Sequence, residues 1–354
     1  MRRGFVAILI AAAILTVGVR ASFAQWVPTG GPSCEYVSSL LVVGSKVFAG
    51  TDQVLFVSEA GPYAWAPAGA GLAEREVHCL IAAGPSLFAG VDWPDYNAEG
   101  VPRSAKDLLT RLRNAVLGGV VRSDDGGLTW APAHAGLPFR TNVRSFALLG
   151  KDLYVGTDVD EEGADEEIGN MEEGVGGGGI FVTRDLGKAW QRTGNFSAPF
   201  LASAGPALFA ESLIEGFIRS NDGGMTWASG GAFSAENVKL CLVRSGSNLV
   251  LGTSQGLFVS TDDGAHWKAS TAGLPAKAAV RRLAAGDGRV FAATASRVFV
   301  SDDDGLRWKE AGTGLPAGIT IWSLAAGPTG VFVGTEGQGV WRLPAVGANA
   351  SKRP

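Results

Sequence analysis

The sequence predicts an all-β fold, a seven-bladed β-propeller, from its glycine content, a recurring phrase that ends in tryptophan, and evenly spaced strand segments. The chain has 354 residues, of which 51 are glycine and 10 are tryptophan. Glycine at roughly twice its usual share of about 7%, without a Gly-X-Y period, is typical of a chain rich in tight turns. Units of about 40 residues that carry four short strands each are the pattern of propeller blades.

The recurring phrase has the form Ser/Thr-x-Asp-x-Gly-x-x-Trp. An altered copy runs from Ser58 to Trp65 and has lost both the aspartate and the glycine. Five intact copies carry the pairs Asp125 and Trp130, Asp185 and Trp190, Asp222 and Trp227, Asp262 and Trp267, and Asp303 and Trp308. The phrase is the Asp-box, and the chain resembles the Asp-box (BNR-like) repeat β-propeller families, which include the sialidase superfamily and exported single-ring propellers similar to the photosystem II assembly and stability factor.

The residues of each box are expected to build the scaffold rather than a binding site. The aspartate belongs to the hairpin between the third and fourth strands, where a carboxylate can accept backbone N–H groups. The glycine supplies a residue with positive φ, and the tryptophan is expected to bury its ring between neighbouring blades. Calcium binding by the boxes is disfavoured, because the spacing recurs without further ligands that vary with it.

Each unit carries the same four strands in order. First and second strands begin ten residues apart, as at Val37 and Val47, a third strand leads into the box, and a fourth begins at its tryptophan. Six tryptophans therefore close six units, and the seventh unit, which starts at Ile321, ends after its third strand. We expect residues 25–28, with Trp26, to supply the missing strand and close the ring. The sequence therefore predicts a single propeller domain over residues 25–344, followed by a flexible tail over residues 345–354.

Residues 1–24 have the composition of a secretory signal peptide. Arg2 and Arg3 precede an apolar segment over residues 5–17, and Ser22-Phe23-Ala24 matches a small-x-small cleavage site. The apolar segment is shorter than the roughly 20 residues that span a bilayer, and no cysteine follows the cleavage site to carry a lipid. The mature protein is therefore expected to be secreted or periplasmic, without a membrane span, and monomeric.

Two insertions, residues 92–118 and 158–178, fall between the second and third strands of neighbouring blades. The first begins with the aromatic residues Trp93 and Tyr96 and continues as a helix with a basic outer face, which either caps the rim or binds a partner. The second carries nine acidic residues and no basic one. It is a solvated loop, a contact for the basic helix or a basic partner, or a Ca²⁺ site over residues 158–173, although Gly169 stands where a calcium loop needs its bidentate glutamate. No other cofactor or metal site is expected.

Candidate binding residues gather where the first strands begin, on the face opposite the boxes. Mixed basic and aromatic groups at a channel mouth suit a polar or anionic ligand, and binding usually resides in long loops on a rigid scaffold. Ordinary solvent-facing polarity would place similar residues there, so both interpretations stay open. One residue after the leading apolar position of each blade stand Ser38, His78, Arg144, Pro199, Lys239, Arg281 and Trp322, with Arg282 beside them.

The resemblance to these families narrows the function. A sialidase needs an arginine triad, for which Arg144, Arg281 and Arg282 are available, but the Phe-Arg-Ile-Pro stretch typical of that family is absent and no catalytic residue is assigned. A net charge of −4 gives no basic face for nucleic acid. Similarity to the single-ring assembly factors implies a non-catalytic propeller that binds a protein or glycan in the cell envelope. The alternative is a carbohydrate-active protein, a glycoside hydrolase or a lectin.

Cysteine usage gives little support to a disulfide framework. The three cysteines, Cys34, Cys79 and Cys241, are too few for one, and at least one of them must be unpaired within a monomer. Whether Cys34 pairs with Cys79 stays open at this point.

Overall fold

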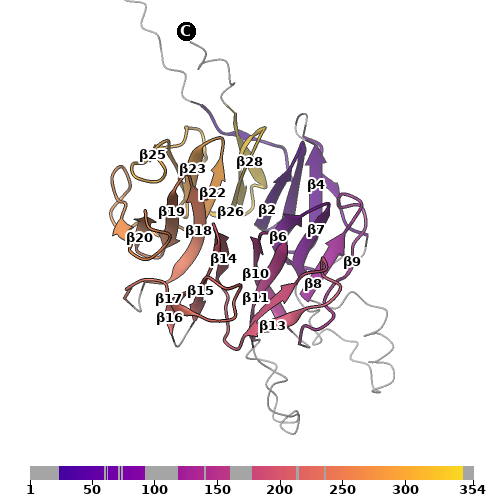
Figure 1. Cartoon of the computed structure of the whole chain (residues 1–354). Coiled ribbons are helices and arrows are strands. Elements are labelled where there is room, and N and C mark those ends of the chain that lie inside the picture. The colour runs from indigo at the N-terminus through magenta and orange to yellow at the C-terminus, as the bar shows by residue number, and fades with distance from the viewer. Residues whose placement is uncertain are drawn as a thin grey trace, which may run out of the picture.

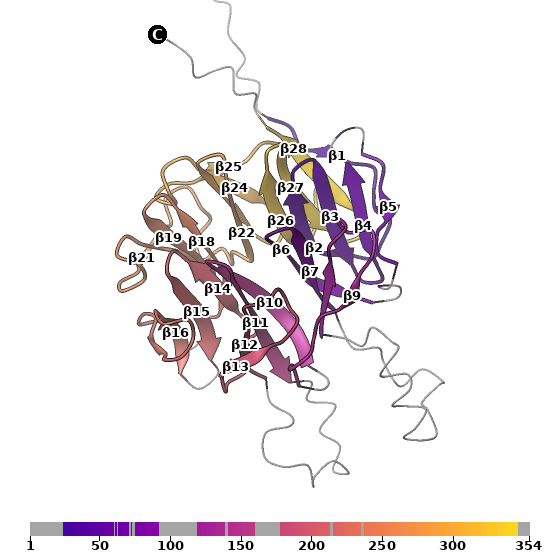
Figure 2. The ribbon, with the colours of Figure 1, turned by 45° about the vertical axis from the view of Figure 1, so that its right-hand side comes forward.

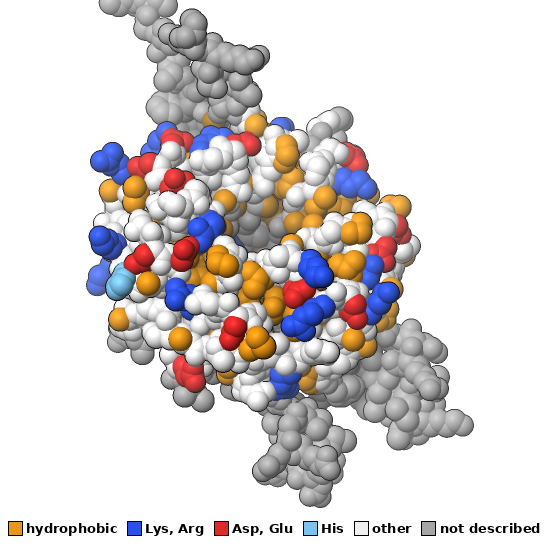
Figure 3. Space-filling view, in the orientation of Figure 1, with side chains coloured by type: hydrophobic (Ala, Val, Ile, Leu, Met, Phe, Trp, Pro, Cys, Tyr) orange, Lys and Arg blue, Asp and Glu red, His pale blue; other side chains and the backbone are white. Residues whose placement is uncertain are grey.

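The computed structural model describes residues 24–345, except residues 60, 62, 71, 73–74, 92–118, 139–140, 160–177, 213–214 and 235–236. The described residues form 28 strands and no helix, and the strands assemble into seven antiparallel four-stranded sheets. The sheets stand around an axis like the blades of a propeller (Figure 1), and the surface is hollowed at the centre of the ring (Figure 3). The predicted all-β, seven-bladed propeller is confirmed. The expected signal peptide, apart from Ala24, and the tail after Ala345 lie outside the described residues.

Each blade begins with the strand beside the central channel, because the first strands of neighbouring blades contact one another. Blades 1 to 3 consist of β2 (Val37–Val43), β3 (Lys46–Thr51), β4 (Leu55–Glu59) and β5 (Ala66–Pro67); β6 (Val77–Ala83), β7 (Ser86–Val91), β8 (Gly119–Ser123) and β9 (Ala131–Pro132); and β10 (Thr141–Leu149), β11 (Asp152–Val159), β12 (Ile180–Thr183) and β13 (Gln191–Gly194). Blades 4 and 5 consist of β14 (Leu201–Ala204), β15 (Ala207–Ser212), β16 (Gly216–Ser220) and β17 (Ala228–Ser229); and β18 (Lys239–Ser245), β19 (Asn248–Thr253), β20 (Gly256–Ser260) and β21 (Lys268–Ala269). Blades 6 and 7 consist of β22 (Arg282–Gly286), β23 (Arg289–Ala293), β24 (Val298–Ser301) and β25 (Lys309–Glu310); and β26 (Ile321–Gly327), β27 (Gly330–Thr335), β28 (Val340–Pro344) and β1 (Val27–Pro28).

The two ends of the described chain close the ring. β1 pairs with β28 in the register Val27–Arg342 and Pro28–Trp341, and Figure 2 shows the two strands side by side. The Trp26 side chain is buried, and its indole N–H donates to the backbone carbonyl of Ala311 in blade 6 over 2.6 Å. The N-terminal strand therefore supplies the fourth strand of blade 7, as predicted, and the open sheet edges of that blade are paired.

Trp26 occupies the same place between blades as the tryptophans of the repeats. Four of those indoles donate their N–H to the residue that directly follows the fourth strand of the preceding blade, which is the position of Ala311 for Trp26. The burial predicted for these rings holds most fully for Trp130, Trp190 and Trp308, whereas Trp65, Trp227 and Trp267 are half-buried. The four equivalent bonds join Trp190 to Ala133 O at 2.6 Å, Trp267 to Gly230 O at 2.7 Å, Trp308 to Ser270 Oγ at 3.1 Å and Trp65 to Thr29 Oγ1 at 3.0 Å.

The intact repeat turns share one hydrogen-bond pattern around the aspartate. In blade 4, Asp222 Oδ1 accepts from the Ser220 hydroxyl at 2.8 Å and from the Thr226 backbone N–H at 2.9 Å. The side chain and backbone of Thr226, with the Ser220 hydroxyl, lower the pKa of Asp222 to about 2. The glycine has positive φ, as predicted, but so does the residue before it, including Leu186 and Asp304, where no glycine stands. The same contacts surround Asp125, Asp185, Asp262 and Asp303.

The strand order divides the connections between two faces of the ring. Because neighbouring strands are antiparallel, the first-to-second and third-to-fourth connections lie on one face, which we call the turn face. The second-to-third connections and the starts of the first strands lie on the other, which we call the insertion face. Residues 92–118 join β7 to β8 and residues 160–179 join β11 to β12, so both insertions connect strands on the insertion face.

Candidate binding site at the insertion face

Five of the seven first strands carry a β-bulge near their start, and the bulge decides which side chains face the channel mouth. The pairing of the first and second strands skips one residue in the first half of β2, β6, β10, β18 and β26. A bulge leaves its extra residue out of the ladder and re-aims its side chain. The skipped residues are Ser38, His78, Arg144, Leu240 and Trp322.

The placement of Lys239 differs from the one expected from the sequence. The skipped residue of β18 is Leu240. Lys239 pairs with Thr253 and so has the position of the repeat at which Val37 pairs with Thr51 and Val77 with Val91. The Lys239 side chain is 3% exposed, and its ammonium lies 3.3 Å from the Glu211 carboxylate of blade 4 and 5.0 Å from the centre of the Phe233 ring. Lys239 therefore joins two blades instead of facing the mouth.

Glu211 is the reason that a lysine is accommodated between these blades. It stands at the position of Gly50 in blade 1, where an added Cβ would lie 2.8 Å from the Cβ of Val77 in the next blade. In blade 4 the glycine is replaced by glutamate and, opposite it, the valine of blade 5 is replaced by Lys239. The carboxylate also accepts the backbone N–H of Lys239 at 2.7 Å. The two unusual residues form one ion pair between the blades, with the lysine buried and the glutamate half-buried.

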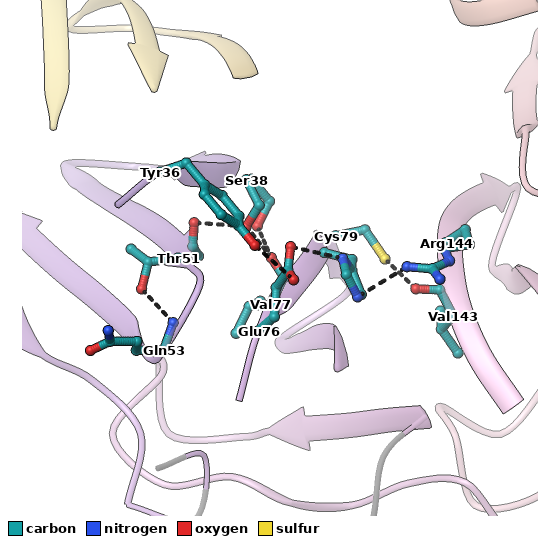
Figure 4. A network of polar contacts seen from close by, with 12 residues as sticks. Tyr36, Ser38, Thr51, Gln53, Glu76, Val77, Cys79, Val143 and Arg144 are labelled. Carbon is teal, nitrogen blue, oxygen red and sulfur yellow. Dashed lines mark hydrogen bonds and ion pairs between the residues drawn. The ribbon is translucent and has the colours of Figure 1, made fainter. Parts of the chain in front are cut away.

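Five side chains from four consecutive blades form a continuous line at the insertion face, which we call the mouth strip: Trp322, Tyr36, Glu76, His78 and Arg144. The rings of Trp322 and Tyr36 stack with their centres 5.2 Å apart. The Tyr36 hydroxyl donates to Glu76 at 3.0 Å, Glu76 lies 3.2 Å from His78 Nδ1, and His78 Nε2 lies 3.1 Å from Arg144 Nη1. Figure 4 shows this line of contacts from Tyr36 through Glu76 to Arg144.

The contacts of the mouth strip fix where its protons lie. A guanidinium can only donate, so His78 Nε2 accepts from Arg144 and the ring proton is on Nδ1, where it is donated to Glu76. Burial, with the Glu76 carboxylate as the next cause, raises the pKa of Tyr36 to about 12, so Tyr36 remains a neutral donor. At the outer end, the Trp322 indole donates to Glu336 at 3.3 Å, and the Trp322 side chain is 37% exposed. The strip offers an exposed aromatic surface at one end and, at the other end, a guanidinium whose orientation is fixed.

Directly below the mouth, small hydroxyl and thiol side chains bind one blade to the next. Each donates to the backbone carbonyl of the leading valine in the following blade. This position accounts for two of the cysteines, because a thiol makes the same bond at a longer distance. The bonds run from Ser39 to Val77 at 2.7 Å, from Ser323 to Val37 at 2.8 Å, from Cys79 to Val143 at 3.6 Å and from Cys241 to Val280 at 3.6 Å.

All three cysteines are free thiols in the structure. The pairing of Cys34 with Cys79, which the sequence leaves open, is therefore not made. Burial raises the pKa of Cys34 to about 11 and that of Cys241 to about 12. Both thiols are therefore protonated and poor nucleophiles at neutral pH.

The other residues expected at the mouth have different surroundings. Ser38 is buried and donates to the carbonyls of Gly50 and Val77. Arg281 is exposed at the start of blade 6, and Arg282, which is half-buried, donates to the Arg281 carbonyl at 2.9 Å. Arg281 and Arg282 therefore stand in blade 6, whereas Arg144 belongs to blade 3.

Several expectations lie outside the described residues. These are Trp93, Tyr96 and the helix of the first insertion, and the acidic segment from residue 160 to residue 173 with its alternative of a Ca²⁺ site. Of the residues that are described, no three or more His, Cys, Asp and Glu side chains gather where they could hold a metal ion. None of the described residues forms a helix long and apolar enough to cross a membrane.

Sequence reasoning missed Tyr36 and Glu76 as parts of the mouth. Tyr36 and Glu76 each stand one residue before the leading valine of a blade, so they occupy the same position of the repeat. A comparison of that position across the blades could have found them. Glu336 follows the second strand of blade 7 and bridges to Tyr36, a contact that arises only because blade 7 lies beside blade 1 in the closed ring.

Comparisons with known proteins agree with the fold. The model of the DUF6242 beta propeller domain matches residues 226–342, and no curated protein matches the chain. A structure described as YCF48 bound to D1 peptide is similar with a TM-score of 0.63 at 14% identity, over 91% of this chain and 97% of that one. YCF48 from Cyanidioschyzon merolae is similar with a TM-score of 0.59 at 13% identity, over 91% of this chain and 99% of that one.

A third similar structure is an extracellular domain. It is the extracellular domain of a putative one component system, BT4673, from B. thetaiotaomicron, with a TM-score of 0.61 at 14% identity. The similarity covers 90% of this chain and 40% of that one. At these identities the comparisons show a shared fold.

Proposed function

We propose that this protein is a non-catalytic Asp-box propeller, exported to the cell envelope, that binds a polypeptide segment of a partner protein at the mouth strip. The observation that carries the proposal is the continuous contact from Trp322 through Tyr36, Glu76 and His78 to Arg144. Interfaces are commonly anchored by aromatic and arginine side chains. Here both kinds are present, and each is held in one orientation before a ligand arrives.

The arrangement suits a peptide better than a small substrate. Trp322 presents an exposed ring to an apolar or aromatic side chain, and Arg144 presents a guanidinium to a carboxylate or a backbone carbonyl. The anchors come from blades 7 and 3, with blades 1 and 2 between them, so the ligand that touches both has to be extended. The insertions of blades 2 and 3 connect strands on the same face. A structure of the same fold described as bound to a peptide supports this choice.

A carbohydrate ligand is the second candidate, because an exposed tryptophan beside a carboxylate, here Trp322 beside Glu336, is also suited to stack on a sugar ring. The two candidates differ in what they require of Arg144. A peptide anchor at the guanidinium needs the positive charge, whereas a neutral sugar stacked on Trp322 does not.

The test is a selection of peptides from a random display library on the full chain, with a glycan array in parallel. Enriched peptides are then titrated against Trp322→Ala and Arg144→Ala, with Leu128→Ala as the matched control, because Leu128 is 65% exposed on the turn face. We expect each mouth variant to weaken binding at least about tenfold, the effect of losing one anchor of about 1.4 kcal/mol, and the control to leave it unchanged. Peptides that bind all four proteins equally, or saturable binding of glycans alone, would contradict the proposal.

A further inference from the structure

On the turn face, each third-to-fourth turn packs over the second strand of the preceding blade, and we call the space that it fills the inter-blade slot. In blade 3, a Cβ added to Gly187 would lie 2.9 Å from the ring of Phe88 in blade 2. In the altered copy of blade 1, Tyr63 takes over this role and meets Phe332 of blade 7 edge-on, with ring centres 6.1 Å apart. Six slots are filled in this way, the other four by Gly127 on Phe48, Gly223 on Tyr154, Gly264 on Phe209 and Gly305 on Val250.

The slot between blades 5 and 6 shows which residues receive the turn. Gly305 lies against Val250 and Val259, and its carbonyl accepts from the hydroxyl of Ser270. The residue before it, Asp304, accepts from the Asn248 amide at its backbone carbonyl, over 3.2 Å. The turn is therefore held by three features: an apolar floor, a hydroxyl donor just after the fourth strand, and an amide donor at the start of the second strand.

The donor to the turn carbonyl recurs in other slots. Lys46, at the start of the second strand of blade 1, donates to Gly126 O at 3.5 Å. Arg122 and Arg219, from third strands, donate to Leu186 O at 2.6 Å and to Asp263 O at 2.8 Å. A cationic or amide side chain that reaches the carbonyl before the glycine is thus a regular part of a filled slot.

Among the residues that the structure describes, no such turn fills the slot between blades 6 and 7. Blade 7 takes its third strand from β28 and its fourth from β1, so no third-to-fourth hairpin exists in it. A cavity of about 550 Å³ lies there. Its lining includes Phe291, Val300 and Ala311, which are the equivalents in blade 6 of Val250, Val259 and Ser270 in blade 5. It also includes Arg289, at the position of Asn248, whose guanidinium lies 5.3 Å from the centre of the Phe291 ring.

We propose that this cavity, the turn cavity, is a second binding site, and that it receives a glycine-containing tight turn of another polypeptide. The occupant's chemistry follows from the filled slots: a backbone carbonyl for Arg289, and next to it a glycine that approaches Phe291 and Val300. Asp287, which lines the turn cavity, has the position of Gly246 in blade 5, and Gly246 lies next to the Asp304 carboxylate of the filled slot. A negative charge before the glycine of the occupant would therefore lie next to the Asp287 carboxylate and be repelled, so that residue should carry no negative charge. A Gly-Gly turn, like Gly223-Gly224 of this chain, meets both conditions.

The chain's own C-terminal residues are a poorer match for the turn cavity. Pro344 and Ala345 line its edge, and residues 346–354, Val-Gly-Ala-Asn-Ala-Ser-Lys-Arg-Pro, contain neither the aspartate nor the tryptophan of the repeat turn. The turn cavity lies on the turn face, so this proposal is independent of the mouth strip and either one can fail alone.

The probe is a fluorescent cyclic peptide that copies residues 218–229, whose first and last residues are paired in the blade. Its control is the same peptide with valine at the position of Gly224. Both are titrated by fluorescence anisotropy against the full chain, Arg289→Ala and Lys46→Ala. Lys46 is the matched control residue, because it has the equivalent place in a slot that is already filled. A fourth protein, which ends at Ala345, is titrated to test the C-terminal residues as occupants.

We expect the glycine peptide to bind the full chain saturably and Arg289→Ala to weaken that binding about tenfold. Lys46→Ala should bind the glycine peptide as the full chain does, and the valine peptide should not bind. Absence of binding to every protein, or equal affinity for the full chain and Arg289→Ala, would overturn the proposal. Binding that appears only in the protein that ends at Ala345 would also overturn it, because the site would then belong to the chain's own C-terminal residues.

Discussion

The largely buried ion pair of Lys239 and Glu211 gives a quantitative prediction about how blades 4 and 5 are held together. The substitution Lys239→Met keeps most of the length of the side chain. It removes the ammonium that lies over the Phe233 ring and leaves the Glu211 carboxylate without its counter-ion. The side chains of Lys239 and Glu211 are 3% and 18% exposed. Removal of one partner of a buried pair costs about 3–5 kcal/mol. We expect the lower end of this range, because the backbone N–H of Lys239 still donates to Glu211.

The second substitution, Glu211→Gln, retains an acceptor for that backbone N–H and removes the negative charge. Combined with Lys239→Met it leaves no uncompensated charge, so the free energy of unfolding of the double variant should lie within about 1 kcal/mol of the wild-type value. The pair should then show a coupling free energy of about 2 kcal/mol or more. Urea unfolding followed by tryptophan fluorescence gives the four stabilities of this double-mutant cycle.

The matched control is the exposed pair of Lys309 and Asp302, whose side chains are 69% and 51% exposed. The same cycle with Lys309→Met and Asp302→Asn should give a coupling of less than about 1 kcal/mol, because exposed ion pairs contribute little. If Lys239→Met alone is as stable as the wild type, or if the two cycles give equal coupling, Lys239 is not held as the structure places it.

Three further predictions concern the scaffold. Trp26→Ala should lower the free energy of unfolding by about 3–5 kcal/mol and speed amide exchange in β28; unchanged exchange there would refute the ring closure. Gly273→Ala should cost about 2 kcal/mol or more in chemical denaturation, because φ is +88° and the new Cβ would overlap the carbonyl of Trp308. Asp222→Asn should lower the melting temperature at pH 7 but not at pH 2. The lowered pKa of about 2 means that the carboxylate stabilises the fold above the pKa of an unfolded aspartate, about 3.9, and that this contribution is lost as the pH falls toward 2. An equal difference at both pH values would contradict this.

The architecture could be predicted because the repeat carries its own turn chemistry. Asp222 and Gly224 specify one hairpin by hydrogen bonds and backbone conformation within eight residues, so each turn can be recognised without knowledge of the rest of the chain. Trp26 could be assigned to the last blade for a similar reason. No repeat phrase precedes Trp26 in the sequence. Blade 7 is the one blade whose own repeat unit ends before a closing tryptophan, so Trp26 can be assigned to it.

The register at the channel mouth could be predicted only in part. His78, Arg144 and Trp322 were found by counting one residue past the leading apolar position, but the same count gave Lys239 where the bulge presents Leu240. The count started from Val238 as the leading apolar residue of blade 5, since a lysine is not expected to be buried between two blades. What makes the lysine possible there is Glu211, which is 28 positions away in the sequence.

The mouth strip itself could not be predicted, because its contacts cross from blade to blade. Tyr36 and Glu76 are 40 positions apart, and His78 and Arg144 are 66 positions apart. Which side chains meet depends on the rotation between neighbouring blades and on the bulge at the start of each first strand. Neither is encoded in the spacing of the repeat. The turn cavity is a similar case, since it exists only because the two chain ends complete one blade.

The central claim, that recognition takes place at the mouth strip, is tested most directly by site-specific photocrosslinking. A photoreactive phenylalanine analogue placed at Trp322 should crosslink to a polypeptide in an envelope fraction, and Arg144→Ala in the same protein should abolish the crosslink. The same analogue at Leu128 on the turn face should not give that product. An identical crosslinked product from position 128, or a product at position 322 that is unaffected by Arg144→Ala, would contradict the assignment of the binding site.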